Sequence, residues 1–126
     1  MAKHSPESFT EHFPELLSEQ IEAERVELDL AVSERVHYFD GHFPGAPVLA
    51  GVAQLHWVVH YTQRYFPQLL EVTAVEVLKF QVMVRPGSRL RLVLEQTKPG
   101  VTLFSYTLED EKVASGRLKW EVAGAE

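Results

Sequence analysis

The sequence contains no cysteine, and this absence excludes several kinds of protein at once. A chain without cysteine has no disulfide framework, no thiolate metal site and no cysteine nucleophile. It also lacks any apolar run of about 18 residues, the length that a membrane-spanning helix needs. The first residues carry no apolar stretch behind their charges, so we expect no secretory signal. These absences favour a cytoplasmic protein that does not enter a membrane.

Positive charge is also scarce, because 12 lysines and arginines face 18 carboxylates and leave a net charge of −6. This balance argues against a nucleic-acid binder, whose affinity comes largely from neutralising phosphates. Residues 1–34 hold nine of the carboxylates against Lys3 and Arg25. Residues 79–98 are basic instead, with five cations and one carboxylate (Lys79, Arg85, Arg89, Arg91, Lys98 and Glu95). Such a stretch is either a solvated strand face or a docking patch for an acidic partner.

The length of 126 residues predicts one domain with a single core, spanning residues 1–126. Residues 1–24 are expected to form an irregular or helical cover segment, because Pro6 and Pro14 interrupt the helical spacing of Phe9, Phe13 and Leu16. A domain of this size has little surface to spare for a deep pocket of its own. A pocket shared between two subunits would solve that problem.

The rest of the chain predicts one helix among several strands. Apolar and charged residues alternate from Val26 to Val32, the pattern of a half-buried strand. Residues 51–66 contain no proline and no internal glycine, and their apolar groups occupy more than one face, which indicates a mostly buried central helix. Four further strands follow, at about residues 72–84, 90–94, 101–108 and 113–122. The predicted class is α+β, with a long central helix wrapped by a curved antiparallel sheet.

The chemistry-bearing residues gather between residues 41 and 56. His42 lies in a proline-bounded loop, and Gly51 opens the predicted helix nine residues later. The free N–H groups of a helix start bind anions and carbonyl oxygens, and glycine allows close approach. His56 lies about one and a half turns further along, roughly 7–8 Å from the helix start. A base, an oxyanion donor and a second titratable group suit a proton abstraction beside a carbonyl.

The stretch Gly41-His42-Phe43-Pro44-Gly45-Ala46-Pro47-Val48-Leu49-Ala50-Gly51-Val52 closely resembles the signature of a known family. These are the hot-dog-fold 3-hydroxyacyl-(acyl carrier protein) dehydratases of bacterial fatty-acid synthesis. Residues 78–90 and 113–118 resemble later strands of the same family. The helix sequence also resembles the small stand-alone dehydratases of aryl-polyene-type pathways. The resemblance covers roughly residues 25–120 and implies the hot-dog fold.

The resemblance implies a role for each residue of the motif. His42 would take the proton from C2 of the acyl thioester, and the N–H of Gly51 would hold the thioester carbonyl. His56 occupies the position of the family's proton donor to the departing 3-hydroxyl. Val52, Phe43 and Pro47 would lie beside the substrate.

The resemblance also implies partners and the absence of a cofactor. The substrate would arrive on an acyl carrier protein, and we expect Arg85, Arg89 and Arg91 to contact that protein. The chain would form a homodimer or a larger homo-oligomer, with His42 and His56 of one site supplied by different subunits. No cofactor is expected, because the thioester itself acidifies C2.

The sequence departs from the family pattern on the helix. The family has Asp or Glu where this chain has His56, and proline where it has Ala50. A histidine, with an ordinary pKa of about 6.5, can still donate a proton near neutrality. Two alternatives remain open: a hot-dog acyl thioesterase, or a catalytically silent acyl-binding subunit. His60, four residues after His56, would complete a three-histidine site with His42, but we expect no metal.

Overall fold

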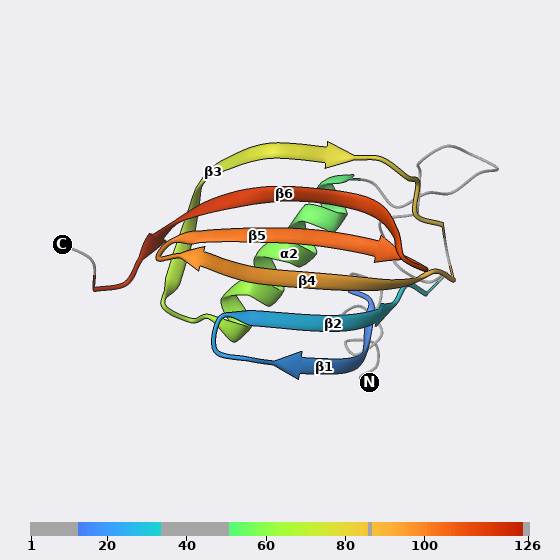
Figure 1. Cartoon of the computed structure of the whole chain (residues 1–126), viewed down its shortest axis with the longest axis horizontal. Helices are drawn as coiled ribbons and strands as arrows, with labels where there is room; N and C mark the ends of the chain where they lie inside the picture. The colour runs from blue at the N-terminus through green and yellow to red at the C-terminus, as the bar shows by residue number, and fades with distance from the viewer. Residues whose placement is uncertain (1–12, 34–50, 86, 125–126) are drawn as a thin grey trace, which may run out of the picture.

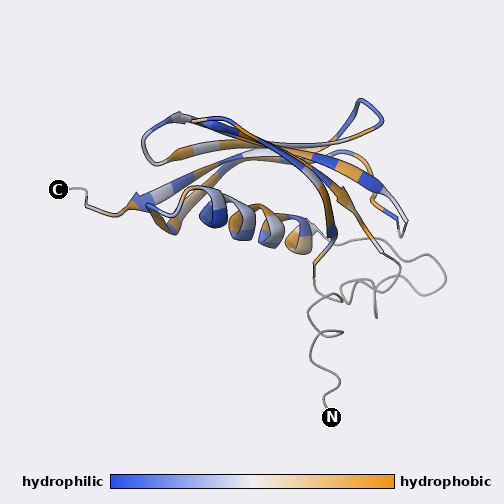
Figure 2. Cartoon of the chain, turned by 90° about the horizontal axis from the view of Figure 1, so that it is seen from below, coloured by the Kyte–Doolittle hydropathy of each residue, from blue (hydrophilic) through white to orange (hydrophobic). Residues whose placement is uncertain are grey.

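The computed structural model describes residues 13–33, 51–85 and 87–124, which fold into a helix packed against a six-stranded sheet (Figure 1). The elements are β1 (Glu15–Ile21), β2 (Arg25–Ala31), α2 (Gly51–Tyr65), β3 (Leu69–Phe80), β4 (Arg89–Lys98), β5 (Val101–Leu108) and β6 (Glu111–Val122). The order across the sheet is β1-β2-β4-β5-β6-β3, and neighbouring strands run antiparallel. The predicted α+β class, with a central helix wrapped by a curved antiparallel sheet, is confirmed (Figure 2).

The alternating sequence of β2 and β4 determines which face of the sheet is buried. Leu28 of β2 lies opposite Leu92 of β4, and the aliphatic residues two positions away on either side are also buried. The charged residues between them point to the outer face, where Asp29 lies opposite Arg91. A period of two in the sequence therefore gives one apolar face that binds the helix and one polar face that meets water.

The irregular or helical segment predicted for residues 1–24 is wrong for residues 15–21, which form β1. Almost every residue of β1 is exposed, so the strand shows no apolar alternation that a sequence pattern could reveal. Its backbone pairs with β2 from Glu15 to Ile21, with one bulge between Leu16 and Ser18. Hydrogen bonding to the free edge of β2 therefore decides the conformation here, and local residue preference does not.

Helix α2 begins at Gly51 and ends at Tyr65, two residues before Pro67, as the absence of internal proline and glycine predicts. One face is buried against the sheet (Ala53, Gln54, Trp57, Val58, Tyr61 and Thr62). The opposite face carries Val52, His56 and His60, which are exposed in the single chain. The prediction of a mostly buried helix thus holds for one face only. Within the described ranges, no helix has the length and apolar character needed to cross a membrane.

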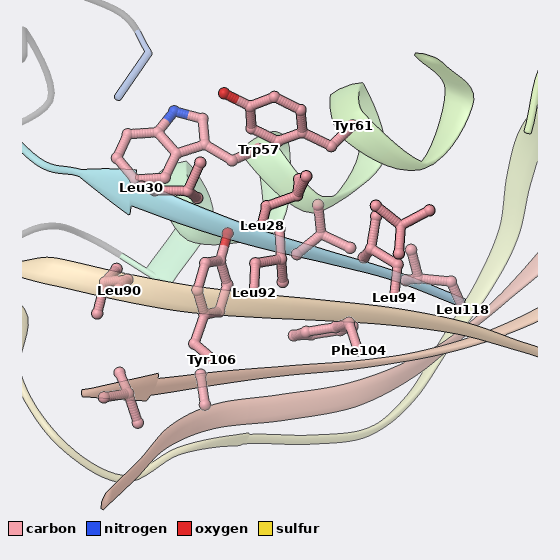
Figure 3. Packing of buried hydrophobic residues seen from close by; sticks show 14 of the residues in the cluster. Leu28, Leu30, Trp57, Tyr61, Leu90, Leu92, Leu94, Phe104, Tyr106 and Leu118 are labelled. Atoms are coloured by element: carbon pink, nitrogen blue, oxygen red, sulfur yellow. The ribbon is translucent and has the colours of Figure 1, made fainter. Parts of the chain in front are cut away.

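Aromatic side chains connect the helix to the centre of the sheet. Trp57 and Tyr61 point from α2 towards Leu28 and Leu30 of β2, while Tyr106 rises from β5 towards the helix (Figure 3). The Tyr106 hydroxyl donates a 2.6 Å hydrogen bond to the carbonyl oxygen of Gln54 in the first turn of α2. A net contribution of about 1 kcal/mol is typical of such a bond. This hydrogen bond therefore attaches the first turn of α2 to strand β5 of the sheet.

Strand β3 is an edge of the sheet and is irregular along its length. It pairs with β6 alone among the described strands, with register shifts between Leu69 and Val72, between Val72 and Ala74, and between Glu76 and Lys79. Within the last of these, Val77 has a left-handed backbone with φ of 54°. Most of the exposed large apolar side chains of the described residues lie on β3 or close to its end (Leu70, Val75, Val77, Leu78, Phe80 and Met83).

Candidate functional site

The start of α2 is a small open site built around Gly51. A Cβ atom placed on Gly51 would lie only 2.9 Å from the ring of Phe80, which comes from the end of β3. Glycine therefore lets this aromatic ring lie directly against the first turn of the helix. The N–H groups of a first turn have no carbonyl partner within their helix, so they are available to a carbonyl oxygen that develops negative charge.

His56 lies on the second turn of α2, on the face directed away from the sheet, and its side chain is exposed. The rise of a helix places it roughly 7–8 Å along the axis from Gly51. No aspartate or glutamate occurs anywhere in α2. His56 is therefore the titratable side chain of the helix nearest to the helix start.

His60 follows one turn later on the same face, and the ring of Phe13 lies against both imidazoles. The ring centroids of Phe13 and His60 are 4.5 Å apart, and those of Phe13 and His56 are 5.5 Å apart. Partial burial lowers the pKa of His60 below its ordinary value, and the charges of His56 and Arg64 lower it further. Among residues 13–33, 51–85 and 87–124, no three side chains of metal-binding type lie together.

Three of the residues predicted for the site, His42, Phe43 and Pro47, lie outside the described residues. The structure therefore places the helix half of the predicted site, Gly51, Val52 and His56, and leaves the loop half as a prediction from the sequence. Val52 follows Gly51 and is 71% exposed, so its side chain is open to whatever lies beside the helix start.

The predicted carrier-protein contact lies at the end of the sheet where β4 begins. Arg85, Arg89 and Arg91 are all exposed. The Nε atom of Arg91 lies 3.2 Å from Oδ1 of Asp29, and this hydrogen-bonded carboxylate raises the pKa of Arg91. The Ser18 hydroxyl bonds the same carboxylate at 2.7 Å and, with Arg91, keeps the pKa of Asp29 below its ordinary value.

The surroundings of these arginines differ. Arg89 and Arg91 line a hollow on the outer face that also contains three carboxylates (Asp29, Glu109 and Asp110). Carboxylates therefore compensate the charge of both arginines within that hollow. Arg85 does not line it, and lies beyond β3 before the turn into β4.

Two residues that contact the site were not assigned to it by sequence reasoning. Phe80 falls within the stretch that resembles the family, but only the fold shows that its ring meets Gly51, which lies 29 positions earlier in the chain. Phe13 belongs to the N-terminal segment. Its helical spacing from Leu16 does not indicate that its ring contacts His56 and His60. Both contacts depend on packing between segments that are distant in sequence.

Apolar side chains are exposed at the helix start. A hollow of about 340 Å³ lies on the outer face of the sheet and is lined by residues of β3 to β6, without any residue of α2. At the helix start, Val52 and Phe80 present apolar side chains that are 71% and 46% exposed, and Met83, three residues after Phe80, is 66% exposed. An acyl chain bound there would need a second wall, which another subunit could supply.

Comparison with known proteins identifies relatives across most of the chain. The family model for ApeI-like proteins, described as ApeI dehydratase, matches residues 18–117. The 3-hydroxyacyl-[acyl-carrier-protein] dehydratase FabZ of Zymomonas mobilis is 29% identical over 119 residues, covering 82% of this chain and 75% of that protein. For the FabZ of Thiobacillus denitrificans the identity is 31%, but the alignment covers only 56% of this chain and 55% of the relative.

Solved structures give the same result for the fold. The dehydratase heterocomplex ApeI:P from Xenorhabdus doucetiae matches with a TM-score of 0.79 and 31% identity, covering 85% of this chain and 96% of that one. A hypothetical thioesterase from Streptococcus pneumoniae, solved with coenzyme A, matches with a TM-score of 0.74 at 11% identity, over 96% of this chain and 97% of that one. The second likeness concerns the fold alone. The predicted hot-dog fold is confirmed.

Proposed function

Because the chain belongs to the ApeI-like dehydratase family, we propose that it removes water from a 3-hydroxyacyl chain held as a thioester on an acyl carrier protein. The product would be a trans-2-enoyl thioester of fatty-acid or polyene-type biosynthesis, made in the cytoplasm. The observation that carries the proposal is the helix start of a chain from this family, where the ring of Phe80 lies against Gly51 and His56 is exposed one and a half turns further on.

The proposed reaction needs one proton removed and one proton supplied. His42 takes the proton from C2, and the electron pair of that C–H bond forms the new double bond between C2 and C3. The C3–O bond breaks, and His56 gives a proton to the departing hydroxyl, which leaves as water. The N–H of Gly51 stabilises the negative charge that builds on the thioester oxygen during proton removal.

This scheme fixes the protonation states that the two histidines need. His42 must be neutral to accept a proton, and His56 must be charged to donate one. Two imidazolium ions close together would repel, so one neutral and one charged ring is the favoured arrangement. The absence of any carboxylate from α2 means that no acidic side chain of this helix competes with His56 for the role.

A synthetic 3-hydroxyacyl thioester of the carrier protein tests the proposal directly. Conjugated-enoyl absorbance should appear when the purified chain is added. Release of free thiol without that absorbance would instead identify a thioesterase. If neither product forms while the acyl carrier still binds, the chain is a silent acyl-binding subunit and the dehydratase proposal is wrong.

We further propose that the chain works as a homodimer whose second copy covers the apolar side chains at β3 and at the helix start. Val52, Phe80 and Met83 leave the site open on one side, and the β3 edge next to them presents Val77 and Leu78. The ApeI:P structure is itself a heterocomplex, so a related but different chain is the alternative partner.

The mass in solution distinguishes these partners. The purified chain should have twice its monomer mass of 14.3 kDa. Val77→Lys should shift it towards the monomer, because a charge buried in an apolar interface is costly. Ile21→Lys on the opposite edge is a matched control, since both side chains are 59% exposed. A wild-type monomer would contradict the homodimer and direct the search to a second hot-dog chain.

Charge reversal tests the proposed carrier-protein contact. The double variant Arg85→Glu and Arg89→Glu should raise the KM for carrier-linked substrate about tenfold or more, because like charges would then face an acidic partner. Arg91 should be changed to Gln, which avoids placing a new carboxylate against Asp29. Turnover of a small pantetheine thioester should not change. Arg25→Glu, at the far end of the sheet, is the control, and an unchanged KM in the double variant would exclude this contact.

A further inference from the structure

One aromatic side chain that precedes β1 packs against the outward face of α2. Phe13 is half-buried, Pro14 is buried, and Leu16 packs against the core. The ring of Phe13 is tilted by 33° to His56 and by 40° to His60, and so lies against two imidazoles that are one helical turn apart. The titratable pair on this face thus has one aromatic neighbour in common.

The same segment is attached to the helix at a second point. The Tyr65 hydroxyl, in the last turn of α2, donates a hydrogen bond to the carboxylate of Glu19. Burial, together with this bond and the charge of Glu19, raises the pKa of Tyr65 to about 12, so the phenol stays protonated and remains a donor. Residues 13–19 are therefore attached to the middle and to the last turn of α2, and Phe13 is not a loosely placed side chain.

The side chain of an exposed histidine on a helix surface can occupy more than one rotamer. Staggered rotamers of an exposed side chain interconvert within nanoseconds, so a proton donor of this kind spends only part of its time pointing in one direction. A packed aromatic ring restricts this choice, because rotamers that would move the imidazole into or away from the ring become unfavourable. A displacement of about 1 Å in a catalytic group can cost a hundredfold in rate.

His60 is the side chain whose protonation would interfere with His56. Arg64 on the same helix is the charged group that faces His60, Tyr61 lies edge-on to it at 5.1 Å, and Phe13 is the neighbour from the N-terminal segment. The shielding of His60 from water lowers its pKa, so it stays neutral near pH 7. A neutral His60 places no second positive charge of its own beside His56.

We propose that Phe13 is a positioning residue for the dehydration, because its ring fixes the orientation of the His56 imidazole and shields His60 from water. The inference rests on the proposed role of His56 as proton donor. Phe13 would give the segment that precedes β1 a role in catalysis. Without that role, the N-terminal residues would contribute only β1, an exposed edge strand, to the sheet.

Two substitutions of Phe13 test this inference. Phe13→Leu keeps an apolar side chain but removes the ring, and Phe13→Ala removes both. Each should lower kcat, by between about tenfold and a hundredfold for Phe13→Ala, while KM for a small 3-hydroxyacyl thioester changes little. Leu17→Ala, which changes an exposed residue of β1, is a control that should keep a near-normal kcat.

Proton resonances of the imidazoles show whether the Phe13 ring lies against them in solution, and the split between kcat and KM then shows whether that contact matters for the reaction. An aromatic ring shifts the signals of protons that lie near its face, so the His56 ring signals should move in Phe13→Leu. In a pH titration, the pKa of His60 should rise in Phe13→Ala, because the imidazole is returned to water. Circular dichroism should show that each variant remains folded.

Every outcome decides the inference. Shifted His56 signals with a lowered kcat support it. Shifted signals with an unchanged kcat, or unshifted signals, overturn it. A wild-type chain that forms no enoyl product, or a His56→Ala variant with full activity, would defeat the proposed function and the inference with it. Failure of the proposed function is distinguishable from unshifted signals, which overturn the inference alone, because the His56 signals would still shift in Phe13→Leu.

Discussion

The His42→Ala variant is expected to lose a factor of about 10² to 10⁴ in dehydration rate, the usual contribution of a positioned general base. Removal of the C2 proton is the step that creates charge on the thioester oxygen, and no other side chain of the Gly-His-Phe-Pro motif can accept a proton at neutral pH. The appearance of conjugated-enoyl absorbance on a 3-hydroxyacyl thioester measures the loss. The KM should change little, since the imidazole acts mainly in the transition state.

A matched control makes this result specific. His37→Ala changes the same residue type five positions earlier, where sequence reasoning assigns no role. Its rate should stay close to that of the wild type. Both variants should keep the thermal midpoint and the solution mass of the wild type. A His42→Ala variant that retains most of its rate would show that another group removes the C2 proton.

The second large effect is expected at His56, where three replacements separate proton donation from packing. His56→Ala should lower the rate about a hundredfold, because the hydroxyl would leave without a proton donor. His56→Gln, which can form hydrogen bonds but cannot donate an acidic proton, should be nearly as slow. His56→Glu places the family's acidic residue type at this position and should keep or raise the activity.

The fold predicts that these replacements are tolerated. His56 is exposed on the outward face of α2, and the buried face of the helix does not include it. Surface substitutions of this kind usually change stability by less than about 0.5 kcal/mol. Rate differences among the variants therefore report on chemistry. Equal activity in the alanine, glutamine and glutamate forms would reduce this side chain to a packing role, and the dehydration would need another donor.

The sequence predicts the central part of the fold because periodicity and breakers are strong there. The absence of proline between Gly51 and Phe66 predicts α2, and the structure ends that helix at Tyr65. Alternation in residues 26–32 likewise predicts β2, which the structure places at Arg25–Ala31. β1 escapes the same reasoning because an edge strand that is exposed on both faces has no apolar period.

The candidate site is predictable only in part, for a related physical reason. A motif read along the chain identifies His42, Gly51 and His56, which are close in sequence. The contacts of Gly51 with Phe80 and of His56 with Phe13 join residues far apart in the chain. No local pattern encodes such a contact, because it depends on how β3 and the N-terminal segment pack around the helix.

The interrupted register of β3 has a consequence for which chains can join this protein. An exposed edge strand is in general a template on which any extended peptide can assemble, and uncontrolled growth of that kind leads to aggregates. The spacing of hydrogen-bonding groups along β3 changes at three places between Leu69 and Lys79. Beyond each of these places, the hydrogen-bonding groups of a regular foreign strand would no longer lie opposite those of β3. A strand with the same register shifts can keep its groups aligned with those of β3. We therefore expect this edge to admit its own copy or a close homologue and to reject unrelated extended peptides.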